Sequence, residues 1–323
     1  MHRILGCVLL VAAMLAPQVL SADDALEEVL VSGEQPGPGL WKVTSGENTL
    51  WILGRYGPLP KAMRWQSAQV ESVLAQSQEL LGPPEVDSNI GFFRGMRLLP
   101  SLLRARANAD GKVLKDLLTA EQYARWARLK QRYIGRADKM ERWRPMFAGL
   151  DLAGRARRDA GLADSDVVSP VIKRVARKYH IKVTNPAVRI EIEDPKRLIA
   201  DFRDTAAEAD VACLVSLMDT VEFGLDDLRV RANAWATGDI ETLRQGGEEQ
   251  SDNACIVAAT DVPSIKQRFD AALELVRSRW LEAAVLALQN NRSTFAVLPM
   301  SDVLASDGAV ERLRAMGYTV VAP

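Results

Sequence analysis

Stretches with alternating or helix-spaced apolar residues divide the chain into short strands and a larger number of helices. Two short β-rich runs, residues 40–44 and 49–54, flank a glycine-containing turn at residues 45–48 and therefore predict a β-hairpin. Further strands are expected at residues 79–82, 181–184, 188–192, 294–298 and 318–321. The strand pattern thus recurs near both ends and in the middle of the chain.

Between these strands, apolar positions recur at the spacing of an α-helix. Thr119, ahead of Glu121 and Gln122, is a suitable N-cap for one of these helices. The predicted helices cover residues 64–78, most of 91–161, and then 167–180, 195–204, 210–229, 228–237, 239–245, 262–289 and 308–316. We expect an α/β fold, with a small central mixed sheet covered by many helices and closed by a βαβ unit over residues 294–321.

The first residues have the layout of a secretory signal peptide. Arg3 supplies a positive charge, residues 4–16 form a short apolar run, and Ser21 and Ala22 are the small residues expected at a cleavage site. A buried N-terminal helix is the alternative interpretation. We expect cleavage after Ala22, which assigns residues 1–22 to the signal peptide.

Two further segments follow from this boundary. Residues 23–39 end in a Pro- and Gly-rich run and are expected to form a flexible leader, and residues 40–323 are expected to form a single domain. The signal predicts export across the inner membrane into the periplasm. No later segment has the length and apolarity of a membrane span, so we do not expect the protein to cross the bilayer.

Charge and cysteine content narrow the possible partners and compartment. The formal net charge of −1 gives no electrostatic reason to expect nucleic acid or an acidic membrane surface as a partner. Cys7 lies in the predicted signal, which leaves Cys213 and Cys255 as an even pair in an oxidising compartment. We predict a structural disulfide between them, worth about 4 kcal/mol on a chain-entropy estimate. Two separately buried thiols are the alternative.

Histidine is scarce. The chain has two histidines, His2 and His180, and the first lies in the predicted signal. One remaining histidine is insufficient for a two-histidine metal site. His180 follows a predicted helix, where its charge complements the helix C-terminus, although a ligand or general-base role is the alternative. Gly-x-Ser-x-Gly, Walker and dinucleotide-binding motifs are absent from the sequence.

Carboxylates are the other candidate functional groups. Glu85, Asp87 and Asp302 lie near the expected ends of strands, where sites gather in α/β proteins. Such carboxylates are suitable ligands for Mg²⁺ or Ca²⁺, although each alone is more often a turn residue. The arginine-rich segments 104–106 and 155–158 fit solvated helix faces, with a site for an anionic sugar or phosphate as the alternative.

Both ends of the expected domain resemble the TraB/GumN family. Residues 40–43 (LWKV) and 50–60 (LWILGRYGPLP) are similar to the family's opening, and residues 295–297 (FAV) and 307–320 (DGAVERLRAMGYTV) are similar to its ending. The resemblance runs from about residue 39 to the end. It implies an α/β fold related to the EreA/ChaN group, and Tiki-type proteases are among the family's members.

The resemblance also implies a place for a metal site. Paired Gly-x-x-His motifs and a glutamate are understood to bind a divalent metal for hydrolysis in this family. Here the first motif reads Gly54-Arg55-Tyr56-Gly57 and the second Pro299-Met300-Ser301-Asp302, so neither has a histidine. Glu85 lies near the expected position of the family's glutamate, and Arg277 lies where the family has an Arg-Asn pair.

Three hypotheses follow from these residues. The leading one is a non-catalytic protein without a cofactor, with a binding or accessory role toward an envelope protein, peptide or glycan. The alternative is a Tiki-type metal-dependent hydrolase or protease with a rebuilt site, in which Glu85, Arg277 and Asp302 surround a divalent metal. The third, a purely structural helical scaffold, predicts no concave site between Gly54, Glu85 and Pro299.

Overall fold

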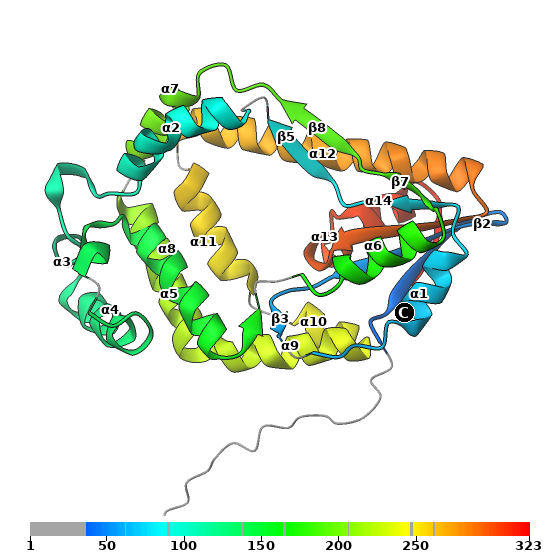
Figure 1. The fold of residues 1–323 in the computed structure, drawn as a ribbon, viewed down its shortest axis with the longest axis horizontal. Helices are drawn as coiled ribbons and strands as arrows, with labels where there is room; N and C mark the ends of the chain where they lie inside the picture. Colours follow the sequence, from blue (N-terminus) through cyan, green and yellow to red (C-terminus); the bar gives the residue numbers. More distant parts are fainter. Residues whose placement is uncertain are drawn as a thin grey trace, which may run out of the picture. The chain divides into compact units, whose positions relative to one another are not determined.

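A computed structural model describes residues 37–323 apart from residues 62, 89–90, 137, 164–165, 206, 246–247 and 261. The predicted signal peptide and most of the predicted leader lie outside the described residues. The described residues belong to a compact unit that spans Gln35–Pro323. This unit confirms the predicted α/β class, since it contains a mixed sheet covered by helices (Figure 1).

Six strands form the main sheet, in the order β10-β1-β2-β9-β4-β7. Their bounds are β1 (Leu40–Ser45), β2 (Asn48–Arg55), β4 (Glu79–Leu81), β7 (Lys182–Thr184), β9 (Ser293–Pro299) and β10 (Thr319–Val321). β2, β9, β4 and β7 are parallel, while β1 is antiparallel to both of its neighbours. The predicted hairpin is β1–β2, and its turn uses Gly46 at a positive φ of 58°.

The expected C-terminal βαβ unit is present in a split form. β9 and β10 run in the same direction, but β1 and β2 lie between them. β9 takes the inner position because Thr294–Leu298 are buried on both faces, as is typical of a central parallel strand. Two further sheets have two strands each: β3 (Leu59–Pro60) pairs with β6 (Leu162–Ala163), and β5 (Glu85–Ser88) with β8 (Ala187–Ile190).

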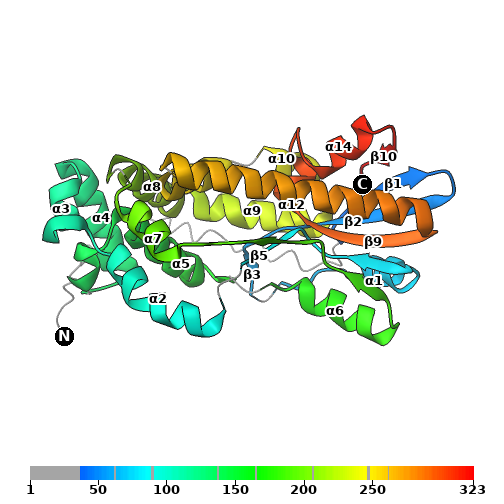
Figure 2. The ribbon, with the colours of Figure 1, turned by 90° about the horizontal axis from the view of Figure 1, so that it is seen from above.

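Helices cover both faces of the main sheet. The long α12 (Pro263–Asn290) packs on β1, β2, β4 and β9, while α1 (Ala68–Ala75) packs on β9 and on α6 (Ser169–Lys178). Figure 2 shows α12 and α6 on opposite sides of the strands. The core beside the sheet includes four fully buried aromatic residues: Trp41, Trp235, Trp280 and Phe295.

A second core is formed entirely by helices. It includes residues of α4 (Ala120–Tyr133), α5 (Pro145–Asp159), α8 (Ala207–Asp219) and α11 (Glu248–Thr260). The predicted Cys213–Cys255 disulfide is present and joins α8 to α11. Near this core, Arg144 and Asp210 form a buried two-point ion pair, with nitrogen–oxygen distances of 2.6 and 2.9 Å.

Seven further α-helices occur in the described residues. They are α2 (Phe92–Ala105), α3 (Leu114–Leu117), α7 (Pro195–Arg203), α9 (Leu225–Thr237), α10 (Ile240–Arg244), α13 (Met300–Leu304) and α14 (Ala309–Ala315). A π-helical segment, Thr220–Gly224, joins α8 directly to α9. Thr119 is the N-cap predicted for α4, accepting a hydrogen bond from the backbone of Gln122 at 3.2 Å. None of the described helices combines the length and apolarity needed to span a membrane.

Several helix predictions need correction: α13 was not predicted, and the helix expected over residues 210–229 is divided between α8, the π-helical segment and α9. α1 begins at Ala68, whereas the sequence pattern suggested residue 64; residues 63–67 are irregular, with Ser67 at the N-cap and the Trp65 ring packed 5.5 Å from that of Trp235. α11 was not predicted, since residues 246–253 are too polar to show an apolar period. Its helical state follows from packing against α8, to which the disulfide ties it.

Candidate functional site

The four parallel strands end at one edge of the main sheet, where α/β proteins place their sites. β2 and β9 are neighbours there, with Gly54 opposite Leu298 and Arg55 opposite Pro299. The two segments that resemble the family motifs, residues 54–57 and 299–302, therefore leave the sheet side by side. The fold brings the segments together although they are far apart in the sequence.

Met300 occupies the space beside Gly54. A Cβ atom placed on Gly54 would lie 2.6 Å from Cε and 2.7 Å from Sδ of Met300, so no larger residue fits without rearrangement. Trp41 lies on the same side, 3.5 Å from that position. The Nε1 of Trp235 donates a 2.7 Å hydrogen bond to the carbonyl oxygen of Gly54. The end of β2 is therefore closed by packed side chains.

The end of β4 is closed in a similar way. The Nε1 of Trp280, on α12, donates a 3.0 Å hydrogen bond to the carbonyl oxygen of Gly82. Both indoles are buried, and a buried carbonyl needs a donor. Two tryptophans from two different helices therefore satisfy the backbone where two strands of the sheet end.

Asp302, on α13, lies beside Arg277, on α12. Its side chain is 14% exposed, and its Oδ1 lies 3.8 Å from Nε of Arg277. This Oδ1 is buried and accepts no hydrogen bond from the described part of the chain. Burial raises the pKa of the Asp302 carboxyl, and the opposing charge of Arg277 does not fully offset that effect.

Arg277 and Asp302 belong to a wider network of charges. Arg277 also lies 3.3 Å from Asp307, while Glu274 accepts hydrogen bonds of 2.8 and 3.0 Å from Arg312. The bonds from Arg312 lower the pKa of Glu274. Residues of α12, α13 and α14 thus join in one ion-pair cluster, and Asp302 is its most buried acid.

Glu85 is placed apart from this cluster. It begins β5, where its side chain is exposed and its backbone N–H donates to Pro186 at 3.0 Å. The chain leaves the main sheet at Gly82 and passes through two prolines before it enters the small β5–β8 sheet. The structure therefore places Arg277 next to Asp302, whereas Glu85 lies in the separate β5–β8 sheet. Asp87, on the same strand, pairs with Arg189 at 3.2 Å.

His180 ends α6. It adopts a positive φ of 53°, and the following Ile181 N–H donates to the carbonyl oxygen of Ala176 at 2.9 Å. This is the geometry of a helix C-terminus closed by a left-handed residue. Across the described residues, no group of three or more His, Cys, Asp or Glu side chains is arranged to hold a metal ion.

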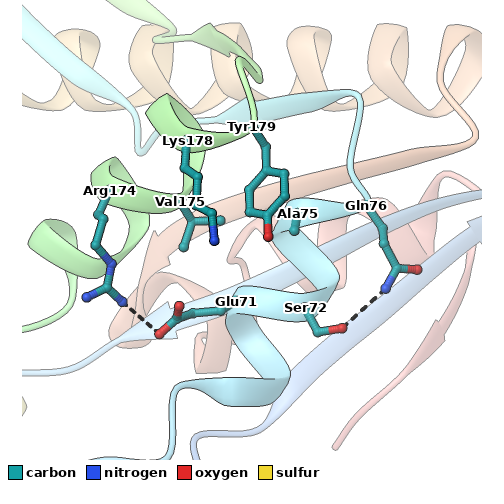
Figure 3. A pocket seen from close by; sticks show the side chains of 8 residues that line it. All are labelled: Glu71, Ser72, Ala75, Gln76, Arg174, Val175, Lys178 and Tyr179. Atoms are coloured by element: carbon teal, nitrogen blue, oxygen red, sulfur yellow. Dashed lines mark hydrogen bonds and ion pairs between the residues drawn. The ribbon is translucent and has the colours of Figure 1, made fainter.

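A pocket of about 610 Å³ lies between α1 and α6 (Figure 3). Its polar lining residues are Glu71, Ser72, Gln76, Arg174, Lys178 and Tyr179. Arg174 spans the two helices with a 2.8 Å hydrogen bond to Glu71, and Gln76 donates to Ser72 at 3.2 Å. The Tyr179 ring is half exposed and has the Lys178 ammonium 5.1 Å from its centroid.

This pocket offers both donors and acceptors and an exposed ring, and its volume is in the range of small-molecule sites. No sequence pattern predicts it. Each half is an ordinary polar helix face, and only the packing of α1 against α6 brings the halves together. A second pocket of about 660 Å³ beside α4 contains the Arg125–Glu222 ion pair and the exposed Phe223.

The sequence model of the TraB/PrgY/gumN family matches residues 39–322. The match covers almost all of the described residues, including both segments that resemble the family motifs. No curated protein and no solved structure matches the chain.

Proposed function

Since the chain belongs to the TraB/PrgY/gumN family, we propose that it is an exported, non-catalytic member with a binding or accessory role in the cell envelope. The proposal takes residues 1–22 as the signal peptide and the periplasm as the location. It takes a peptide, a glycan or another envelope protein as the partner.

The residues at the two family-like motifs carry the non-catalytic part of the proposal. The two strand ends that bear the family-like motifs are adjacent, and a metal site there needs open space between side chains that can coordinate it. In this chain the first motif position holds Gly57, which has open space around it but no side chain to coordinate a metal, while Met300 and Trp235 pack beside Gly54. Glycine and aspartate stand at the two motif positions where the family resemblance implies histidine.

Metal content distinguishes this function from a catalytic one. We expect the purified protein to retain no stoichiometric Zn²⁺, Mn²⁺ or Mg²⁺ after loading and dialysis, as measured by elemental mass spectrometry. Asp302→Ala is then indistinguishable from the wild type. Retention of one equivalent that is lost in Asp302→Ala, but kept in the exposed control Asp307→Ala, would overturn the proposal.

A metal-dependent hydrolase with a rebuilt carboxylate site is the second candidate. One observation favours it: Asp302 is buried, has an unbonded Oδ1 and has a raised pKa, features that gather at functional sites. Arg277 would then position that carboxylate, and Glu85 would have to approach from the β5–β8 sheet. The metal-retention experiment decides between the two candidates.

The pocket between α1 and α6 is the proposed binding site. Its cations Arg174 and Lys178 outnumber its single carboxylate, Glu71, and hydroxyl, amide and ring groups complete the lining. This chemistry suits an acidic saccharide, which presents hydroxyls, a carboxylate and an apolar ring face. The proposed ligand class is therefore a uronic-acid-containing glycan of the envelope.

Calorimetric titration with a uronic-acid-containing oligosaccharide tests this site. We expect Tyr179→Ala and Arg174→Ala each to weaken binding about tenfold, which corresponds to 1.4 kcal/mol. Phe223→Ala removes a more exposed ring elsewhere and is expected to bind as the wild type does. Equal binding of a neutral oligosaccharide of the same length, or no effect of Tyr179→Ala, would contradict the assignment.

A further inference from the structure

Helix α2 (Phe92–Ala105) exposes most of the large apolar residues whose side chains the structure describes. Met96, Leu99, Leu102 and Leu103 are 57%, 52%, 49% and 59% exposed, whereas Leu98 and Ala105 are buried. Leu98 and Ala105 are seven residues apart and so mark the face that packs on the rest of the molecule, where α2 contacts α7. A continuous stripe of large apolar side chains therefore faces outward.

The opposite part of the exposed surface is basic. Arg97 and Arg104, also seven residues apart, lie on one face of the helix beside the apolar stripe, and both are exposed. The chain from residue 88 to residue 109 contains four arginines, Arg94, Arg97, Arg104 and Arg106, and no aspartate or glutamate. In a chain with a net charge of −1, this concentration of positive charge is local.

An exposed apolar stripe bordered by arginines is the pattern of a helix that lies in a membrane interface, with its apolar side among the acyl chains and its cations at the headgroups. We propose that α2 binds the surface of an anionic bilayer and so attaches the protein peripherally to the membrane. The absence of acidic residues favours a lipid surface over a protein partner, because a protein interface gains specificity from charges of both signs.

The position of α2 allows this contact. Figure 2 shows α2 along one side of the ribbon, beside α7, with α12 and the strands of the main sheet away from it. No described residue of α2 lines the pocket between α1 and α6 or pairs with the ends of β2 and β9. The attachment is therefore independent of the ligand and metal assignments made above.

Vesicle flotation tests the proposal with the purified full chain. The vesicles contain either phosphatidylcholine alone or phosphatidylcholine with phosphatidylglycerol. We expect the protein to float with the anionic vesicles and to be released as salt rises, because exposed charges are screened. Protein that stays in solution with both compositions at low ionic strength would overturn the proposal.

Two double variants separate the apolar contribution from the charge. Leu99→Glu/Leu103→Glu is expected to reduce partitioning more than about tenfold, and Arg97→Glu/Arg104→Glu to reduce it by a similar factor on anionic vesicles only. All of these side chains are exposed, so the fold tolerates the changes. Every variant carries the same N-terminus, so differences report on α2 alone.

A matched control uses exposed leucines on another helix. Leu275→Glu/Leu286→Glu on α12 changes the same residue types and adds the same charge, and we expect it to float as the wild type does. If Leu99→Glu/Leu103→Glu instead floats normally, α2 is not the attachment site. If that variant converts a dimer to a monomer by light scattering while no protein floats, the stripe joins two copies of the chain and the membrane proposal is wrong.

Discussion

The two edges of the main sheet each hold a buried carboxylate, and their surroundings differ. At the amino-terminal edge, Glu79 accepts hydrogen bonds from Asn291 at 2.8 Å and from the Thr184 hydroxyl, and it pairs with Lys182 at 3.0 Å. At the carboxyl-terminal edge, Oδ1 of Asp302 lies 3.8 Å from Nε of Arg277. Both oxygens of the Glu79 carboxylate have polar partners, whereas Oδ1 of Asp302 accepts no hydrogen bond from the described residues.

This difference appears in the pKa values. Burial raises the pKa of Glu79, but the bonds from Thr184, Lys182 and Asn291 outweigh burial and leave it below its usual value. For Asp302 burial dominates, and the pKa is raised. The hydrogen bonds at the amino-terminal edge therefore stabilise the charged form of Glu79. At the carboxyl-terminal edge, burial destabilises the charged form of Asp302.

Removing the charge of Glu79 is expected to have the largest effect. Glu79→Gln should lower the free energy of unfolding at pH 7 by about 2–3 kcal/mol, since hydrogen bonds to a charged group are worth about 1.5–3 kcal/mol. Because the pKa of Glu79 is lowered in the folded protein, its contribution is present above the usual value of 4.5 and is lost as pH falls through the folded value.

Urea unfolding of the wild type and Glu79→Gln at several pH values measures this effect. The gap in stability should be full at pH 7 and narrow below pH 4.5 as the wild-type carboxyl becomes protonated. Glu47→Gln is the control, since Glu47 is largely exposed in its pair with Arg292 and such pairs contribute little. A gap that stays constant with pH would mean that Glu79 acts through packing alone.

The tryptophans that bond to the strand ends should have the next largest effect. Trp280→Phe and Trp235→Phe each keep a ring but leave the carbonyl of Gly82 or Gly54 without its donor, at a cost of about 1–2 kcal/mol. Trp51→Phe is the control, because the partly buried Trp51 lies beside Lys42 instead. Equal losses in all three variants, measured by thermal unfolding, would show that ring volume rather than the hydrogen bond decides stability.

Much of the fold was predictable because it depends on local patterns. The β1–β2 hairpin follows from two apolar runs around Gly46, and the N-cap of α4 follows from Thr119 and Gln122. The Cys213–Cys255 disulfide followed from parity and the expected compartment. Strand order did not follow, since the pairing of β2 with β9 joins residues about 240 positions apart.

The candidate site was less predictable, because its geometry depends on tertiary packing. Sequence reasoning chose Arg277 and Asp302, which the structure places together, and Glu85, which it places in another sheet. The Pro83-Pro84 pair signals a change of direction but not where the chain goes next. Met300 beside Gly54 and the two tryptophan bonds carry no local signal, since each joins segments distant in the sequence.

Asp302→Asn should give the smallest effect and one of the opposite sign to Glu79→Gln. A carboxyl whose pKa is raised by folding favours the native state at low pH, and this contribution is lost as pH rises from below the usual value of 3.8 through the folded value. At pH 7 the wild type has a buried charge at residue 302, whereas the asparagine of the variant is neutral. The melting temperature of the variant should therefore exceed that of the wild type at pH 7. The excess should disappear in acid.

Thermal unfolding between pH 3 and pH 7 measures this difference, with Asp307→Asn as the control because that carboxylate is mostly exposed in the same cluster. A variant less stable than the wild type at pH 7 would mean that the attraction of Arg277 outweighs burial. The two edges would then both be built for stability, and the case for Asp302 as part of a former or rebuilt site would fail. A gain at pH 7 fits a carboxylate retained at a cost to the fold, as functional groups are.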